Sequence, residues 1–213
     1  MTTVLVTRAR GQADELVARL EALGYEVAVC PLIEVEPLGD DPIDVSAYDW
    51  VVLTSANGAA ELRRRMRGVP AHVAAIGRAT ADAFGGEVQL IPEMATQEGL
   101  LAELPRPAGR VLFAGAEGAR TLLVDELGAD FVPLYRTQEV RPEHLPPADV
   151  AVVASPSAVR SLAATGAALP VISIGPETSR EARRLGLAVL AEAETHGTSG
   201  LVHAVVSAMP PAP

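Results

Sequence analysis

The stretch LTSANGAAEL, residues 53–62, is written again as ASPSAVRSL at residues 154–162, about a hundred positions later. Two further pairs keep the same order along the chain: AAIGRATADAF at 74–84 with ISIGPETSREA at 172–182, and TQEGLLAEL at 96–104 with TSGLVHAVV at 198–206. In the first two pairs an apolar, strand-like run ends in glycine, proline or a hydroxyl residue, and a helical pattern then begins. The repeat predicts two similar α/β domains that face one cleft.

Length and composition agree with two domains. The chain has 213 residues, enough for two domains of about a hundred residues that each bury a core. Hydrophobic residues make up 49% of the sequence and aromatic residues only 3%, which indicates aliphatic sheets covered by helices on both faces. The formal net charge is −10, and no basic run is interleaved with aromatic residues, so we expect neither a nucleic-acid nor a membrane partner.

The sequence also argues against metal centres and secretion. Cys30 is the only cysteine, so an intramolecular disulfide and a cysteine zinc cluster are excluded, and the four histidines lack metal-ligand spacing. No segment reads as a secretory leader or as 18 uninterrupted apolar residues. We therefore expect a soluble cytoplasmic protein without a metal.

Periodicity predicts strands that alternate with helices, which is typical of parallel sheets. Strands are expected at 3–7, 25–30, 50–54, 72–76, 87–91, 110–114, 130–135, 149–154, 170–174 and 187–191. Helices with clear boundaries are expected at 11–24, 58–66, 79–84, 97–104, 119–127 and 199–208.

One of the two domains is predicted to be discontinuous, because the segment from residue 110 to 137 is similar to the first 35 residues. Residues 1–34 and 146–213 would form this domain, and residues 40–136 the domain inserted into it. Residues 35–39 and 137–145 would be linkers that act as a hinge. The expected fold is α/β, with two open parallel-sheet domains of the flavodoxin-like type joined by a two-stranded crossover.

The ordered series of motifs resembles the uroporphyrinogen-III synthase family of tetrapyrrole biosynthesis. The motifs are VLVTRARG, PLIEVEPL, TSANGAAEL, IGRATA, ATQEGLLAEL, VPLYRT, SPSAV, IGPETSREARRLGL and THGTSGLV. The resemblance implies a lyase without a cofactor that cyclises linear hydroxymethylbilane, inverts the terminal pyrrole ring (ring D) and releases water to give uroporphyrinogen III. The two crossovers are short and the sequence shows no obvious apolar surface stripe, so we expect a monomer. The resemblance adds transient contact with hydroxymethylbilane synthase as an expectation.

A substrate with eight carboxylates requires anion-binding groups in a protein of net charge −10. Backbone N–H groups at helix N-termini can supply them, with help from neighbouring hydroxyls. The candidate binding residues are Thr54, Ser55, Gly77, Thr80, Ser155, Ser157, Gly175, Thr178, Thr198 and Ser199. The alternative for each hydroxyl residue is helix capping alone. Arg8 and Arg10 follow the first strand, where each would either bind a carboxylate or serve as a surface residue.

Tyr135 is the catalytic candidate that the resemblance carries over, through the YRT motif at the second crossover. A phenol with a pKa of about 10 is protonated at neutral pH and can donate a proton to a departing oxygen. The alternative is a tyrosine that only packs at a strand end.

Two other functions remain open from the sequence. A sensor domain of the same fold would bind a tetrapyrrole or another anion without turnover, and would be expected to carry an output domain. A nucleotide-sugar transferase with facing α/β domains would bind a nucleotide sugar. The loop GAEGART, residues 115–121, lacks the lysine of a P-loop, and VLVTRARG lacks the spacing of a dinucleotide-binding fingerprint.

Overall fold

The computed structural model describes residues 1–211 and divides the chain into two compact units. Unit 1 consists of Met1–Glu34 and the chain from Thr137 onward, and unit 2 is Val35–Arg136. The residues expected to be linkers are partly strand, because 35–37 belong to β3 (Ile33–Pro37) and 137–139 to β9 (Asp130–Glu139). Within residues 1–211, no helix combines the length and apolarity needed to cross a membrane.

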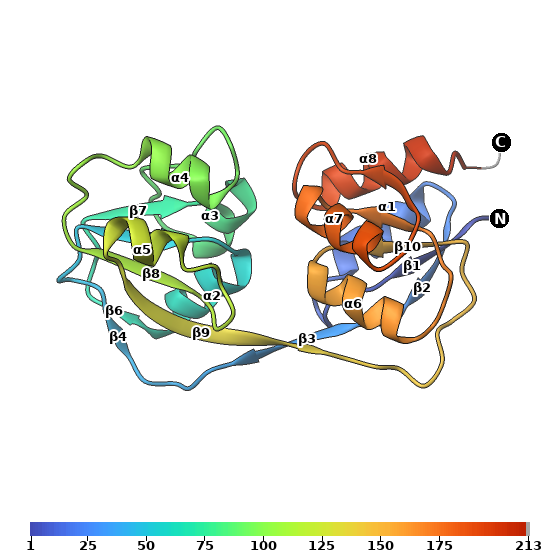
Figure 1. Cartoon of the computed structure of the whole chain (residues 1–213), viewed down its shortest axis with the longest axis horizontal. Coiled ribbons are helices and arrows are strands. Elements are labelled where there is room, and N and C mark those ends of the chain that lie inside the picture. Colours follow the sequence, from blue (N-terminus) through green and yellow to red (C-terminus); the bar gives the residue numbers. More distant parts are fainter. Residues whose placement is uncertain (212–213) are drawn as a thin grey trace. The chain divides into compact units, whose positions relative to one another are not determined.

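Unit 1 is an open parallel sheet with helices on both faces (Figure 1). Its strands are β1 (Thr3–Val6), β2 (Glu26–Val29), β10 (Val150–Val153), β11 (Val171–Ser173) and β12 (Val189–Glu192), and its helices are α1 (Asp14–Ala22), α6 (Pro156–Ala164), α7 (Pro176–Arg184) and α8 (Thr198–Ala208). The spatial order β2-β1-β10-β11-β12 is the flavodoxin-like order 2-1-3-4-5. The predicted fold class is thus confirmed in this unit.

The core of unit 1 follows from strand alternation. Val4, Val6, Val150 and Val152 point to one face of the sheet, where they pack with buried residues of α1 and α8. On the other face α6 packs against α7. Since both faces are covered, the central strands are apolar throughout, and the sequence VAVV of β10 is completely buried.

Unit 2 repeats this architecture with a permuted chain. Its further strands are β5 (Trp50–Leu53), β7 (His72–Ala75) and β8 (Val111–Ala116), and its helices are α2 (Ala56–Arg65), α3 (Arg78–Phe84), α4 (Gln97–Glu103) and α5 (Leu122–Leu127). The sheet order is β3-β9-β8-β5-β7. Here β8 and β9 take the places of β1 and β2, while β5 and β7 take those of β10 and β11. One core lies between the sheet and α2 with α3, and the other between the sheet and α4 with α5.

The strand predicted at 87–91 is wrong. Only Leu90 bridges to Ala74, as an isolated parallel contact. The side chain of Gln89 accepts the backbone N–H of Val73 at 2.7 Å, which takes the place of a ladder bond, and Pro92 then removes a backbone donor. The structure also contains a short pair that the sequence did not predict, β4 (Ile43–Asp44) with β6 (Met66–Arg67), so α2 ends before Met66.

The crossover strands β3 and β9 pair with each other. The backbone N–H of Leu38 donates to the carbonyl of Leu134 at 2.8 Å, and that of Val140 donates to the carbonyl of Leu32 at 2.9 Å. Residue numbers thus increase along one strand as they decrease along the other. The pair is therefore antiparallel, and the chain passes from one unit into the other through it.

The third repeat is explained by a close backbone approach. In unit 2 a Cβ on Gly99 would lie 2.1 Å from the carbonyl oxygen of Met94, and in unit 1 a Cβ on Gly200 would lie 1.9 Å from that of Thr195. These glycines align with each other, so Thr96 corresponds to Gly197 rather than to Thr198, which corrects the sequence pairing by one position. Both loops depend on the missing side chain.

We expect Gly200→Ala to destabilise the protein by about 1–3 kcal/mol, because backbone must shift to admit the methyl group. Gly118→Ala is the matched control, since a Cβ there would meet nothing within 4 Å. Thermal unfolding followed by calorimetry should show a lowered transition only for Gly200→Ala. Equal transitions for the two variants would contradict the close approach.

Candidate functional site

The candidate residues follow the carboxyl ends of parallel strands, the edge at which open α/β sheets bind ligands. In unit 1 the strand order reverses between β1 and β10, which lead into Arg8 and Ser155 respectively. In unit 2 it reverses between β8 and β5, and β5 leads into Thr54 and Ser55. Each unit therefore presents its own set of loops at its own switch point.

Ser55 and Ser155 adopt the same capping geometry. Both have extended backbones, with φ and ψ of −160° and 152° for Ser55 and −162° and 156° for Ser155. Each hydroxyl accepts a backbone N–H three residues on, from Gly58 at 3.0 Å and from Ala158 at 3.2 Å. Both serines therefore cap their helices, which is the alternative role considered for them.

Tyr135 is aimed by an irregularity in its strand. The β8–β9 register pairs Gly115 with Pro133 and then Ala116 with Tyr135, so Leu134 is the extra residue. As a result Leu134 and Tyr135 both join the core that underlies α2, although successive residues of a regular strand point to opposite faces. The hydroxyl of Tyr135 lies 2.9 Å from that of Ser55.

The surroundings of Tyr135 keep its phenol protonated. The residue is 6% exposed, and burial raises the pKa of its hydroxyl, while hydrogen bonds with the side chains of Ser55 and Asn57 act in the opposite direction. The neutral form therefore prevails at physiological pH, beside two polar groups that stabilise the anion. Asn57 was not predicted from the sequence, because a residue in the first turn of a helix carries no signal of contact with a distant strand.

In unit 1 the structure brings Arg8 together with Thr198. The guanidinium of Arg8 donates to Thr198 Oγ1 at 3.4 Å and to the carbonyl of Gln12 at 3.3 Å. Burial lowers the pKa of Arg8, with the carboxylate of Glu15 opposing, and an arginine remains charged in either case. Ser199 accepts instead from Arg19, at 2.9 Å, and Arg10 is exposed.

The other candidates differ in accessibility. Thr80 and Thr178 are only 4% and 3% exposed, so their hydroxyls are largely withdrawn from solvent. Ser157 is half-buried and accepts from Arg160 at 3.1 Å. Gly77 and Gly175 are the N-caps of α3 and α7.

His196, in the segment that leads into α8, is a further neighbour of the site that the sequence did not predict. A Cβ on Gly175 would lie 2.6 Å from His196 Nε2, so the imidazole occupies the space that a side chain would need. A contact between residues of two different loops cannot be predicted from the hydrophobic periodicity of either loop.

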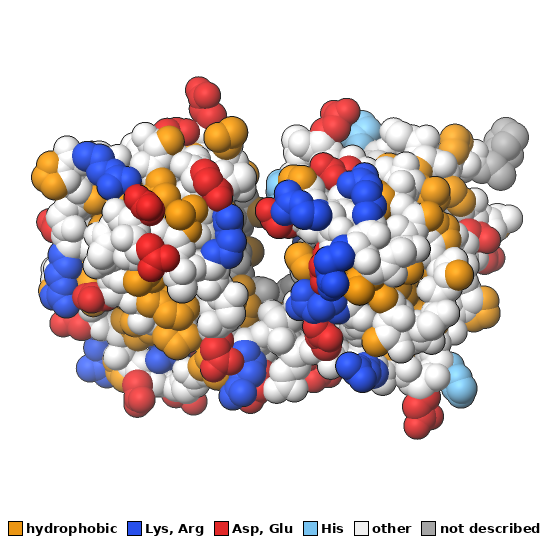
Figure 2. All heavy atoms as spheres, viewed as in Figure 1, with side chains coloured by type: hydrophobic (Ala, Val, Ile, Leu, Met, Phe, Trp, Pro, Cys, Tyr) orange, Lys and Arg blue, Asp and Glu red, His pale blue; other side chains and the backbone are white. Residues whose placement is uncertain are grey.

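Figure 2 shows basic and acidic side chains next to one another on the visible face of unit 1, and several arginines of this unit form ion pairs with glutamates. Arg160 contacts Glu139 at 2.7 Å, and Arg184 and Arg160 contact Glu181 at 2.7 and 3.5 Å. Together they hold the pKa of Glu181 down at about 2, with Arg184 as the main cause. Such paired cations are poorly placed to bind an added anion.

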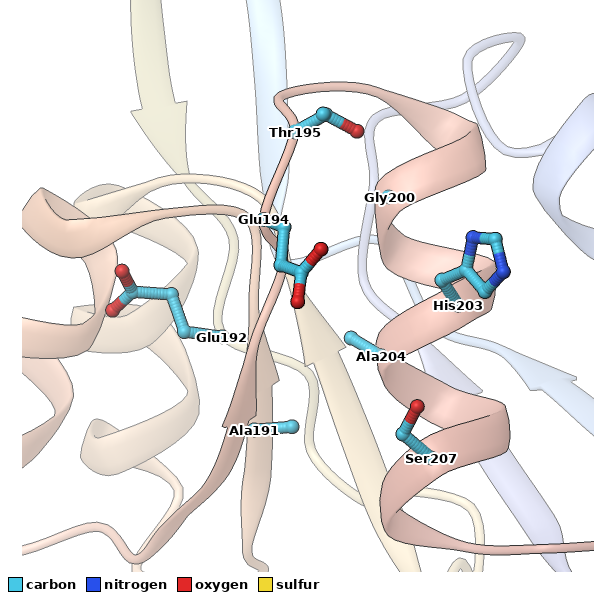
Figure 3. A pocket seen from close by; sticks show the side chains of 8 residues that line it. All are labelled: Ala191, Glu192, Glu194, Thr195, Gly200, His203, Ala204 and Ser207. Carbon is cyan, nitrogen blue, oxygen red and sulfur yellow. The ribbon is translucent and has the colours of Figure 1, made fainter.

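A pocket of about 290 Å³ lies between β12 and α8, away from the switch point (Figure 3). It is lined by Ala191, Glu192, Glu194, Thr195, Gly200, His203, Ala204 and Ser207. The side chain of Glu194 extends toward α8, and that of Glu192 points the other way. The carboxylate of Glu194 in this hollow makes it unsuitable for a polyanion. Over the described part of the chain, no group of three or more His, Cys, Asp or Glu side chains could hold a metal ion.

Comparison with known proteins gives one consistent family. The model of the family described as uroporphyrinogen-III synthase HemD matches residues 14–203. The chain is similar to the uroporphyrinogen-III synthase of Synechococcus elongatus, with 28% identity over 95% of this chain and 94% of that protein. It is also similar to the chloroplastic uroporphyrinogen-III synthase of Oryza sativa subsp. japonica, with 30% identity over 97% of this chain and 80% of that protein.

Among solved structures, a mutant uroporphyrinogen III synthase from the extremely thermophilic bacterium Thermus thermophilus matches with a TM-score of 0.58 and 16% identity, over 98% of this chain and 99% of that one. This likeness supports the two-domain α/β fold.

Ser55→Ala is expected to raise the pKa of Tyr135 further, because a hydrogen bond that favours the phenolate is lost. Ser155→Ala is the matched control, since it also removes an N-cap, worth about 1 kcal/mol, but within residues 1–211 Ser155 forms no hydrogen bond with a tyrosine. Alkaline ultraviolet titration, with Tyr135→Phe to assign the signal, measures the shift. A downward shift in Ser55→Ala, or the same shift in both serine variants, would contradict the assigned contact.

Proposed function

The chain belongs to the uroporphyrinogen-III synthase family, and from that premise we propose that it is a cyclising hydro-lyase that converts hydroxymethylbilane into uroporphyrinogen III. The observation that carries the proposal is the contact of Tyr135 with Ser55 at the carboxyl edge of unit 2. This contact places a buried, neutral phenol among the loops that ligands of such sheets approach.

The reaction requires an acid and a positioning surface. Loss of the terminal hydroxyl as water leaves an azafulvene, which the substituted carbon of the far pyrrole attacks. The resulting spirocyclic intermediate fragments and recloses with ring D inverted, and a proton is released as the last pyrrole regains aromaticity. Since the substrate also closes unaided to the isomer without inversion, the protein has to set which carbon attacks.

We assign the acid role to Tyr135. Ser55 Oγ already accepts the N–H of Gly58, so its own proton can be donated to the phenol oxygen of Tyr135. The phenol proton is then free to pass to the departing hydroxyl, which leaves as water. Ser55 and Asn57 would stabilise the phenolate until the proton released at ring closure restores the phenol.

The internal repeat breaks at this residue, which supports the assignment. PLI at 31–33 comes after β2, and PLY at 133–135 lies within the equivalent strand β9, so Ile33 stands in unit 1 where Tyr135 stands in unit 2. Both side chains are buried. A purely structural position would accept the same aliphatic residue twice, whereas the phenol adds a proton donor in one unit only.

Substrate carboxylates would be met by backbone N–H groups and hydroxyls at the sheet edges of both units, with Arg8 and Thr198 in unit 1 and Thr54 in unit 2. No cofactor is needed for a reaction of this kind, because acid assistance and positioning supply its demands. We further propose that the protein acts as a cytoplasmic monomer, which receives its substrate in transient contact with hydroxymethylbilane synthase.

The function is tested by adding the folded protein to freshly generated hydroxymethylbilane, oxidising the products and separating the type I and type III porphyrins. Predominant type III isomer is expected. Type I alone, formed at the rate seen without protein, would overturn the proposal and favour a binding domain without turnover.

Tyr135→Phe should lower kcat at least about tenfold, with little change in KM, because the proton donor is lost while the ring still packs. Tyr25→Phe is the control, since the hydroxyl of Tyr25 donates to the carbonyl of Met209, remote in the chain from these loops. Initial rates of type III formation measure both variants. An undiminished kcat in Tyr135→Phe would remove this residue from the mechanism.

A further inference from the structure

Arg78 is an exposed cation that begins α3 of unit 2, directly after Gly77. Among residues 1–211 it has no ion-pair or hydrogen-bond partner for its guanidinium. Arg120, which lies at the same edge of the sheet, is different, because Glu98 accepts two hydrogen bonds from it at 2.7 and 3.1 Å.

The position of Arg78 is unfavourable for the stability of its helix. The N-terminus of a helix carries partial positive charge, so a cation in the first turn is repelled and an acidic residue or proline is preferred. The equivalent helix of unit 1, α7, has Pro176 at this place and Glu177 after it. α3 has no acidic residue in its first turn. Helix stability therefore does not account for an arginine here.

Arg78 begins at the same edge of the sheet of unit 2 as the loop that contacts the proposed acid. The backbone N–H of Ile76 donates to the carbonyl of Leu53 at 2.9 Å, and Arg78 and Ser55 each lie two residues beyond this bond. They emerge from the neighbouring strands β7 and β5 at one edge. Ser55 in turn contacts Tyr135. Arg78 thus begins the helix that lies next to the loop positioning the phenol.

We infer that Arg78 is a specificity-determining residue that binds a carboxylate of the linear tetrapyrrole, on the same unit as Tyr135. The inference rests on the proposed function. In a protein of net charge −10, a cation without a partner at this edge is a suitable ligand for an acetate or propionate side chain. In unit 1 the cations lie in the loop after β1, at Arg8 and Arg10. The corresponding positions of unit 2, at the end of β8, are Gly115 and Glu117.

The test compares Arg78→Gln with Arg183→Gln. Arg183 is likewise exposed, but it lies in the last turn of α7, where a cation is favourable to the helix. Arg78→Gln should raise the KM for hydroxymethylbilane about three- to tenfold, with kcat within about twofold and an unchanged or higher Tm. Arg183→Gln should leave KM unchanged and should not raise Tm.

A second readout does not depend on turnover. Fluorescence titration with uroporphyrin III, a stable octacarboxylate, should show weaker binding by Arg78→Gln at low salt, and the difference should shrink in about 1 M NaCl, where charges are screened within about 3 Å. Unchanged KM and porphyrin affinity, or equal losses in both variants, would overturn the role of Arg78. If the wild-type protein made only type I isomer, the proposed function would fail, and the porphyrin titration would still decide the role of Arg78.

Discussion

The arrangement of the candidate site in unit 2 depends on the hydroxyl of Ser55. One oxygen caps α2 through the N–H of Gly58 and lies 2.9 Å from the phenol of Tyr135. The cap holds the serine in place, and the extra residue at Leu134 turns the tyrosine toward it. The start of α2, the irregularity in β9 and the buried phenol are therefore connected through this one hydroxyl. Unit 1 keeps the helix cap, at Ser155, but has Ile33 in place of the tyrosine.

Part of the arginine content is already paired with carboxylates of the protein. The net charge of −10 and the glutamates around Arg160 and Arg184 leave much of the arginine content paired. Backbone N–H groups at helix N-termini add partial positive charge that no carboxylate of the protein can neutralise completely. A polyanionic ligand would thus be bound by local groups at the sheet edges against an unfavourable overall field.

Much of the fold could be predicted from the sequence, because the repeated loops and the alternation of strands and helices are local patterns. The strand at 87–91 was mispredicted, since its apolar residues resemble a strand while the side chain of Gln89 takes over a ladder bond. The two-residue pair of β4 and β6 is too short to leave a pattern. Asn57 contacts Tyr135, and His196 lies against Gly175. These contacts join segments far apart in the chain, so no local sequence pattern predicts them.

We propose that Tyr135 donates the proton with which the hydroxyl of hydroxymethylbilane departs. The most direct test of this role is the ratio of wild-type to Tyr135→Phe rates for hydroxymethylbilane and for the same bilane carrying a leaving group that needs no proton. If Tyr135 is the acid, the ratio will be large for the hydroxyl substrate and close to one for the other. The same large ratio for both substrates would contradict it.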